Sequence, residues 1–190
     1  MNQWKGGNMF TANDLLWGEY KQFEGPWFPG VQKFQLPSNP TDNDRILAVM
    51  CATEGGAWDA YNGYDSCICT SGLIQWCEQG QYSVSDLFGD LIVAGRRDLL
   101  QPVLSFINEH GHSFKENKKG RWRFFLDNDE EVDTLAEQRR IFFLDATGEK
   151  GSWDEASKQY AREFGAAIVN VWQTPAAQAV QAAYTVKRLK

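Results

Sequence analysis

Residues 54–77, EGGAWDAYNGYDSCICTSGLIQWC, mark the point where a predicted helix gives way to a small sheet. Before them, Thr41-Asp42-Asn43-Asp44 offers several N-cap oxygens, and apolar residues follow at helical intervals. The helix should run to about Glu54, because Gly55-Gly56 tolerates the left-handed backbone that follows a helix end. From Trp58 to Cys77, turn residues separate short runs of β-branched and aromatic residues, which predicts a small antiparallel sheet or hairpin.

Two carboxylates in this stretch, Glu54 and Asp65, should lie in different surroundings. Glu54 falls in the last turn of the predicted helix, where the negative end of the helix dipole helps to keep a proton on the carboxyl group. Asp65 should lie at the sheet edge, solvated and hydrogen-bonded, and Thr70 carries a hydroxyl able to orient a water molecule. One protonated and one ionised carboxyl group beside a held water can cleave a glycosidic bond. Glu54, Asp65 and Thr70 are therefore the predicted catalytic residues.

The chain is rich in aromatic residues, with eight Trp, six Tyr and twelve Phe. Amphipathic rings beside a polar cleft suit the flat faces of sugars, although any one of these rings could equally belong to the core. We expect substrate contacts close to the predicted catalytic residues, from rings that stack on sugars and amides that hydrogen-bond to them. The candidates are Trp58, Tyr61, Tyr64 and Trp76 for stacking, and Asn62 and Gln75 for hydrogen bonds.

Length and charge limit the class of protein. A chain of 190 residues predicts a single domain over residues 1–190. The net charge of −6 argues against a nucleic-acid partner, because binding phosphates requires clustered Lys and Arg. No apolar run approaches the roughly 18 residues of a membrane span, and no basic region followed by an apolar run indicates a signal peptide.

Four cysteines, Cys51, Cys67, Cys69 and Cys77, fall within 27 residues around the predicted site. Their spacing does not match the paired cysteines, two to four residues apart, of structural zinc sites. Disulfides depend on the redox compartment, which leaves thiols that fill small apolar spaces as the expected state. We predict no metal and no other cofactor.

The remaining chain predicts a mainly helical body, so the expected fold class is mainly α with a small sheet (α+β). Residues 1–40 are broken by Gly and Pro and should wrap the body, with a helix over Asn13–Phe23 capped by Thr11 or Asn13. Residues 41–80 carry the predicted site, and residues 81–190 form a helical lobe. Its helices are predicted over Ser83–Ala94, Arg97–Glu109, Asp129–Asp145, Ser152–Trp172 and Pro175–Leu189, with a hairpin over Ser113–Leu126 that turns at Lys118-Lys119-Gly120.

A glutamate at a helix end, an aspartate on a short sheet and the pattern Thr70-x-Gly72-Leu73-Ile74-x-Trp76-Cys77 together resemble the lysozyme superfamily, especially phage-type lysozymes and bacterial chitosanases. In the chitosanase pattern an aspartate stands five residues before the threonine, as Asp65 stands before Thr70. The resemblance covers about residues 44–80. It implies a lysozyme-like fold with Glu54 as general acid, Asp65 as general base and Thr70 as the residue that orients the water.

The sequence departs from these patterns in two ways. Glu54 and Asp65 are 11 residues apart, which is longer than in phage-type lysozymes and shorter than in chitosanases, so Asp59 is an alternative second carboxylate. Gln75-Trp76 also resembles goose-type lysozymes and lytic transglycosylases, which can work with a single glutamate. If two carboxylates act, roughly 6.5–9.5 Å between them gives inversion and about 5–5.5 Å gives retention. We expect inversion.

The expected substrate is bacterial peptidoglycan, cleaved at its β-1,4 bonds by a muramidase or endolysin, because the compact, signal-free layout resembles a phage lysozyme or a virion-associated wall-degrading domain. Chitosan is the second candidate, since a cationic polymer is attracted to an acidic protein. A lytic transglycosylase and a non-catalytic wall-binding or structural module with this fold are further alternatives. We expect a monomer that acts on glycan strands, in the host cytoplasm and then the cell wall or periplasm, or attached to a phage particle.

Overall fold

The computed structural model describes residues 9–54, 57–64, 66–78 and 83–188. The part of the chain so described is an α+β structure, with α-helices around small antiparallel sheets, as the sequence predicts. None of its helices is long and apolar enough to cross a membrane. The elements follow in the order η1 (Ala12–Asp14), β1 (Leu16–Tyr20), β2 (Phe23–Phe28), α1 (Asp42–Glu54), β3 (Tyr61–Asn62), β4 (Thr70–Ser71), β5 (Trp76–Cys77), α2 (Val84–Val93), η2 (Arg97–Leu100), α3 (Gln101–Glu109), β6 (Ser113–Glu116), β7 (Trp122–Phe125), α4 (Leu135–Phe143), α5 (Glu155–Trp172) and α6 (Pro175–Arg188).

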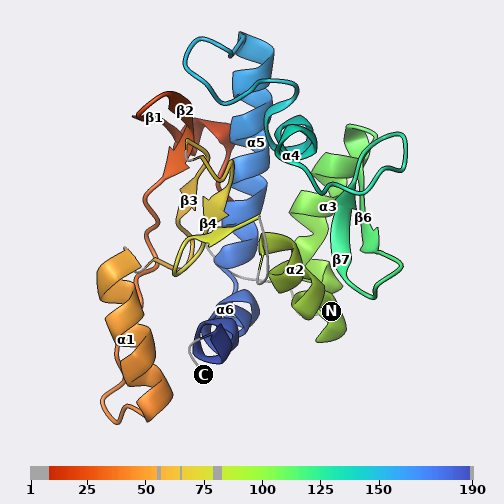
Figure 1. The fold of residues 1–190 in the computed structure, drawn as a ribbon. Helices are drawn as coiled ribbons and strands as arrows, with labels where there is room; N and C mark the ends of the chain where they lie inside the picture. Colours follow the sequence, from red (N-terminus) through yellow and green to blue (C-terminus); the bar gives the residue numbers. More distant parts are fainter. Residues whose placement is uncertain (1–8, 55–56, 65, 79–82, 189–190) are drawn as a thin grey trace.

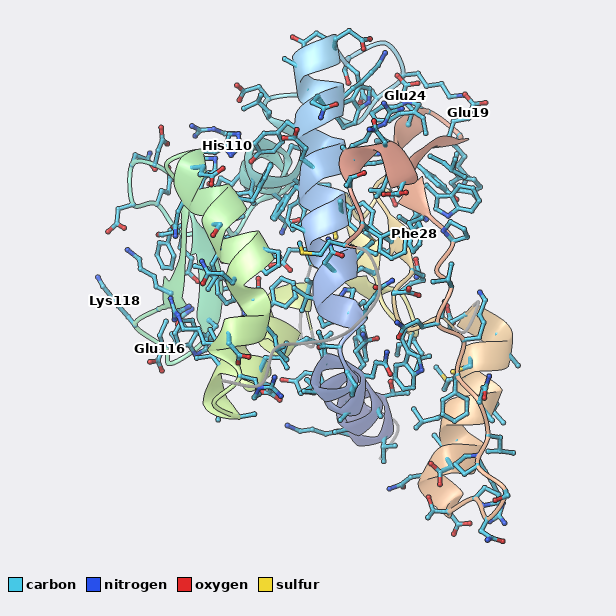
Figure 2. The ribbon with its side chains drawn as sticks, turned by 180° about the vertical axis from the view of Figure 1, so that it is seen from behind. Glu19, Glu24, Phe28, His110, Glu116 and Lys118 are labelled. Carbon is cyan, nitrogen blue, oxygen red and sulfur yellow. The ribbon has the colours of Figure 1, made fainter. Side chains whose placement is uncertain are left out.

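Strands β1 to β5 form one antiparallel sheet in which each strand pairs with the next along the chain. In Figure 1 this sheet lies to the left of the long helix α5. Seen from behind, the hairpin lies to the right of α5, and Phe28 of β2 lies beside the helix (Figure 2). We call the face of the sheet that packs on α5 the inner face, and the opposite face the outer face.

The inner face approaches α5 closely because the helix carries a glycine there. A Cβ atom at Gly165 would lie 2.6 Å from Cδ2 of Leu15 and 2.9 Å from Cε1 of Tyr61, so any side chain would push the helix off the sheet. Nearby, the indole Nε1 of Trp172 donates a hydrogen bond to Oγ of Ser71 at 3.0 Å. These contacts join the sheet to a hydrophobic core that draws residues from both ends of the described chain.

Helix α1 begins and ends where the sequence predicts. The backbone N–H of Thr41 donates to Oδ2 of Asp44 at 2.8 Å, and the N–H of Asp44 donates to Oγ1 of Thr41 at 3.3 Å, which forms a reciprocal N-terminal cap. The helix packs against α6 and buries Leu47. Its last residue is Glu54, and the predicted stop at Gly55-Gly56 lies outside the described residues.

The predicted helix over Asn13–Phe23 is wrong. Thr11 does cap a helix, but only the single 3₁₀ turn η1, and the chain then forms the β1–β2 hairpin. The strand is favoured because neighbouring side chains have different surroundings: Trp17 packs edge-on against Trp153 at 4.9 Å between ring centroids, whereas Leu16 is exposed. This is the alternation of a strand and not the periodicity of a helix.

The hairpin is also tied to a distant part of the chain. Oε1 of Glu24 accepts a hydrogen bond from the N–H of Gly151 at 3.1 Å, and Glu19 pairs with Lys150 at 3.1 Å. In Figure 2, Glu19 and Glu24 lie at the end of the hairpin farthest from α1. The N-terminal segment therefore contributes two strands to the main sheet, and the prediction of an irregular wrapping segment is wrong for residues 16–28.

The C-terminal predictions are mostly confirmed. Helices α2, α3, α5 and α6 lie within the predicted ranges, as far as the described residues reach, and β6 and β7 form the predicted hairpin. The helix expected over Asp129–Asp145 is confirmed only from Leu135, because Phe125 and Glu131 form a β-bridge and Thr134 then caps α4. Helix α5 starts at Glu155 with Asp154 as its cap, and not at Ser152.

Candidate functional site

Strand pairing separates the predicted site residues onto the two faces of the sheet. In antiparallel strands, directly paired residues point to the same face and neighbours along a strand point to opposite faces. Tyr61 pairs with Ser71, and Ser71 pairs with Trp76, so these three side chains belong to the inner face. Asn62 pairs with Thr70. These two side chains therefore belong to the outer face.

Thr70 and Gln75 are held in a short hydrogen-bonded chain. Oγ1 of Thr70 donates to Oε1 of Gln75 at 3.1 Å, and Nε2 of Gln75 donates to the carbonyl of Gly72 at 3.0 Å. Gln75 has a φ of 53° and Gly72 a φ of 79°, in the turn between β4 and β5 that brings Gln75 back over Thr70. Thr70 is 6% exposed. Because its hydroxyl proton is engaged by Gln75, its oxygen keeps lone pairs for an acceptor role.

Tyr61 and Trp76 are core side chains. Tyr61 is 0% exposed and Trp76 is 1% exposed, and the Trp76 ring packs edge-on against Tyr184 at 6.0 Å between centroids. Burial also raises the pKa of the Tyr61 hydroxyl well above its ordinary value. Neither ring offers a face to a sugar. We therefore do not retain the stacking role expected for these two residues.

Asn62, Tyr64 and Trp58 remain half-buried and accessible in part. Oδ1 of Asn62 accepts a hydrogen bond from the N–H of Tyr64 at 3.0 Å, and among the described residues its amide nitrogen has no acceptor, so it can donate to a ligand. Trp58 packs edge-on against Phe34 at 5.8 Å, and its carbonyl accepts a hydrogen bond from Nε2 of Gln181 at 3.0 Å. Of the four predicted stacking rings, Tyr64 and Trp58 are thus the two with exposed surface.

Glu54 is exposed at the end of α1, and the chain passes from there into the sheet. Ala57 forms a β-bridge with Lys33, and β3 begins at Tyr61. Asp65, the predicted general base, lies between β3 and β4 in sequence but outside the described residues. The structure therefore groups Asn62, Thr70 and Gln75, while the separation of Glu54 from Asp65 stays a prediction.

Asp59, the alternative second carboxylate, has a structural role. Its side chain is 0% exposed. Oδ1 accepts hydrogen bonds from the backbone N–H groups of Val31 at 2.9 Å and Gln32 at 3.0 Å, and Oδ2 accepts one from Nε2 of Gln173 at 3.0 Å. A carboxylate that is buried and bonded at both oxygens cannot reach a substrate water. Asp59 instead joins the segment after β2 to the C-terminal end of α5.

Removing the Asp59 carboxylate should destabilise the protein. We expect Asp59→Ala to lower the free energy of unfolding by on the order of 3 kcal/mol, because three hydrogen bonds to a buried carboxylate are lost and the buried amide of Gln173 loses its acceptor. Asp59→Asn keeps one acceptor oxygen and should cost clearly less. Denaturant unfolding followed by circular dichroism measures both values, and equal stability of wild type and Asp59→Ala would contradict the assignment.

Glu78 is a buried carboxyl group that the sequence analysis did not select. It follows β5 and is 7% exposed. Oε2 accepts a hydrogen bond from the N–H of Ser85 at 2.9 Å, and Oε1 is bonded to the hydroxyl of the same residue. Burial raises the pKa of Glu78 to about 7, although the bonds to Ser85 and the charge of Arg123 oppose this shift. Side chains alternate along a strand, so Glu78, two residues after the buried Trp76, should also point inward. This alternation is the feature of the sequence that could have identified Glu78 as buried.

The neighbours of Glu78 connect three elements. Asp86, in the first turn of α2, binds Nη1 of Arg123 at 2.8 Å and Nη2 of Arg121 at 2.8 Å, so the start of α2 is joined to the β6–β7 hairpin. Glu78 bonds to Ser85 one residue earlier and so joins the end of β5 to the same helix turn. This network connects the end of β5 to α2 and to the β6–β7 hairpin, and none of its residues belongs to the outer face.

The buried carboxyl predicts a pH-dependent stability. The folded-state pKa of about 7 lies above the ordinary value of 4.5, so the folded protein binds this proton more tightly than the unfolded chain. Its contribution to stability is therefore complete below about pH 4.5 and is lost as the pH rises to about 7. Relative to wild type, Glu78→Gln should gain about 3 kcal/mol between these pH values. Urea unfolding at a series of pH values tests this, and a pH-independent difference would refute it.

The four cysteines are thiols in the structure. Cys69 is 0% exposed, and burial raises its pKa well above the ordinary value, while burial raises the pKa of Cys51 to about 11. Cys69 therefore acts as a small apolar filler on the inner side of the sheet. Across the described ranges, no group of three or more His, Cys, Asp or Glu side chains is placed to hold a metal ion.

Three cavities lie away from these residues. One, of about 690 Å³, lies between the start of α1 and the end of α6, with Leu47, Ala182 and Val186 among its lining residues. A second, of about 510 Å³, lies at the turn of the β6–β7 hairpin, with Asn117 and Glu131 among its lining residues. A third, of about 470 Å³, lies between the N-terminal residues 9–13, α3 and α5. Comparisons with protein-family models, with curated proteins and with solved structures found no match to this chain. Function is therefore inferred from the residues of the chain itself.

Proposed function

We propose that the protein is a glycoside hydrolase with a lysozyme-like fold that cleaves β-1,4 bonds of bacterial peptidoglycan by acid/base catalysis with inversion. The observation that supports it best is the Thr70–Gln75 hydrogen bond on the outer face of the sheet, next to Asn62. These polar groups follow, in the chain, an exposed glutamate at a helix end. The proposal also uses the resemblance of residues 44–80 to the lysozyme superfamily.

In the proposed reaction, Glu54 donates its proton to the glycosidic oxygen as the bond from that oxygen to the anomeric carbon breaks. A water molecule attacks the anomeric carbon from the opposite side and gives one proton to Asp65. Its other proton is hydrogen-bonded to the oxygen of Thr70, which can accept because its own proton is directed to Gln75. Glu54 is exposed without substrate, and a glycan lying over it would displace the water that solvates its carboxyl group.

Two other activities remain as alternatives within the same class of chemistry. Chitosan is favoured by the net charge of −6, since a polycation is attracted to an acidic surface. A lytic transglycosylase would use Glu54 without a second carboxylate, and its products would carry anhydro ends. The non-enzymatic alternative is a wall-binding module that keeps the fold without turnover.

Glu54→Gln should abolish activity without unfolding the protein. We expect the rate of clearing of a peptidoglycan suspension to fall by at least about 10²-fold, because the variant cannot donate a proton to the leaving oxygen. Glu109→Gln is the matched control, since Glu109 is also an exposed glutamate at the last position of a helix, α3. Equal clearing by wild type and Glu54→Gln would exclude Glu54 as the acid. Activity retained by Asp65→Asn but lost in Glu54→Gln would indicate the single-glutamate mechanism.

Thr70 should act through its hydroxyl group. Thr70→Val keeps the size and branching of the side chain and removes the oxygen that holds the water, so we expect the clearing rate to fall about 10- to 100-fold. Thr70→Ser keeps the hydroxyl and should retain most of the activity. Circular dichroism checks that both variants are folded. Equal rates for the two variants would assign Thr70 a packing role only.

A further inference from the structure

The outer face continues from the predicted site onto the β1–β2 hairpin. Strand pairing aligns one residue from each of five strands in a single row on this face, in the order Leu16, Trp27, Asn62, Thr70 and Cys77. With strands about 4.8 Å apart, the row is about 19 Å long. Trp27 is therefore the immediate cross-strand neighbour of Asn62, and the row is long enough for more than one sugar ring.

Two glycines shape the surface beside this row. Gly18 and Gly25 pair with each other on the outer face of the hairpin. A Cβ atom at Gly18 would lie 2.5 Å from two ring carbons of Tyr64, and one at Gly25 would lie 2.4 Å from the carbonyl oxygen of Gly63. The Tyr64 ring thus lies on the hairpin where there are no side chains beneath it, with its centroid 6.5 Å from that of Trp27.

This aromatic surface is partly exposed, and Nζ of Lys21 lies over its Tyr20 ring, 5.0 Å from the ring centroid. Leu16 is 52% exposed and Tyr20 is 53% exposed, and Trp27 and Tyr64 are half-buried. Glu19 and Glu24 are cross-strand neighbours in the hairpin and alternate along their strands with the outer-face residues. They therefore belong to the inner face. All outer-face residues of β1 to β5 are therefore neutral.

We propose that Trp27 and Tyr64, with Leu16 at the rim, form a glycan-binding surface that extends the active site and holds neutral N-acetylhexosamine units next to the bond that is cleaved. This inference rests on the proposed function, since it names the substrate contacts of the same site. Neutral pyranose rings suit the surface because Trp27 and Tyr64 are partly exposed rings, Asn62 adds an amide donor, and the outer-face residues of the strands carry no charge. A nucleic acid would require clustered cations along the row, and an ionic protein partner would require charges there, whereas all five residues of the row are neutral.

Binding can be tested without turnover in the Glu54→Gln background. Isothermal titration with a hexamer of N-acetylglucosamine should give a measurable Kd, which should rise about tenfold, equivalent to about 1.4 kcal/mol, in Trp27→Ala and in Tyr64→Ala. Tyr64→Phe keeps the ring and should bind like the parent. Unchanged affinity in both alanine variants, or no binding by the parent, would overturn the proposal.

Two further measurements apply if an alanine variant does not fold. Leu16→Asp changes a side chain that is already exposed, and the charge it adds to the row should weaken binding about tenfold. Val93→Asp is its control, because Val93 is 79% exposed on α2. In a titration of the Glu54→Gln protein followed by amide chemical shifts, the hexamer should perturb Gly18, Gly25 and Asn62. Shifts confined to residues around the cavity between α1 and α6 would refute the proposed surface.

The outcome separates this inference from the proposed function. If Glu54-dependent clearing is observed but binding is insensitive to Trp27, Tyr64 and Leu16, the hydrolase stands and the surface is wrong. If binding depends on these residues but wild type cleaves neither peptidoglycan nor chitosan, the surface stands as that of a glycan-binding module and the catalytic proposal is wrong.

Discussion

The contact between the inner face of the sheet and α5 is the constraint on which the rest of the site depends. Gly165 allows Tyr61 to lie against the helix, and Trp172 fixes Ser71 by a hydrogen bond in the core. Because side chains alternate along a strand, burying Tyr61 and Ser71 on one side places Asn62 and Thr70 on the other. A slip of one residue in this register would move the polar pair to the inner face and the rings of Tyr61 and Trp76 to the outer face.

Further contacts hold the short strands that carry the outer face. The short strands β3, β4 and β5 have few ladder hydrogen bonds of their own, so they depend on neighbours for their position. The β1–β2 hairpin pairs with one side of them, and Glu78 attaches the other side to α2 through Ser85. Asp59 ties the segment after β2 to the end of α5. Buried carboxylates thus serve the scaffold, whereas the proposed acid, Glu54, is exposed.

Local sequence signals predict part of this arrangement. The cap at Thr41 and the helix to Glu54 are confirmed, as is the small sheet after Trp58, because caps, glycines and turn residues act over a few positions. The helix predicted over Asn13–Phe23 is instead strand β1 and the turn after it, and β2 replaces chain that was predicted to be irregular. These strands are held by pairing with β3 and by packing on α5, and both contacts are distant in sequence.

The site was predicted as a set of residues but not as a surface. Sequence proximity selected Tyr61 and Asn62 together, although alternation sends them to opposite faces, and it passed over Trp27, which only the pairing of β2 with β3 brings beside Asn62. The register that sorts these residues depends on tertiary contacts such as that of Gly165. The sequence also could not show whether Asp59 is catalytic or structural, because its three hydrogen-bond donors come from segments far away in the chain.

Mass spectrometry of the products from purified peptidoglycan and from chitosan, each incubated with wild type and with Glu54→Gln, tests the central claim most directly. We predict muropeptides with reducing ends from wild type and none from Glu54→Gln. No product from either polymer, or the same products from both proteins, would contradict it.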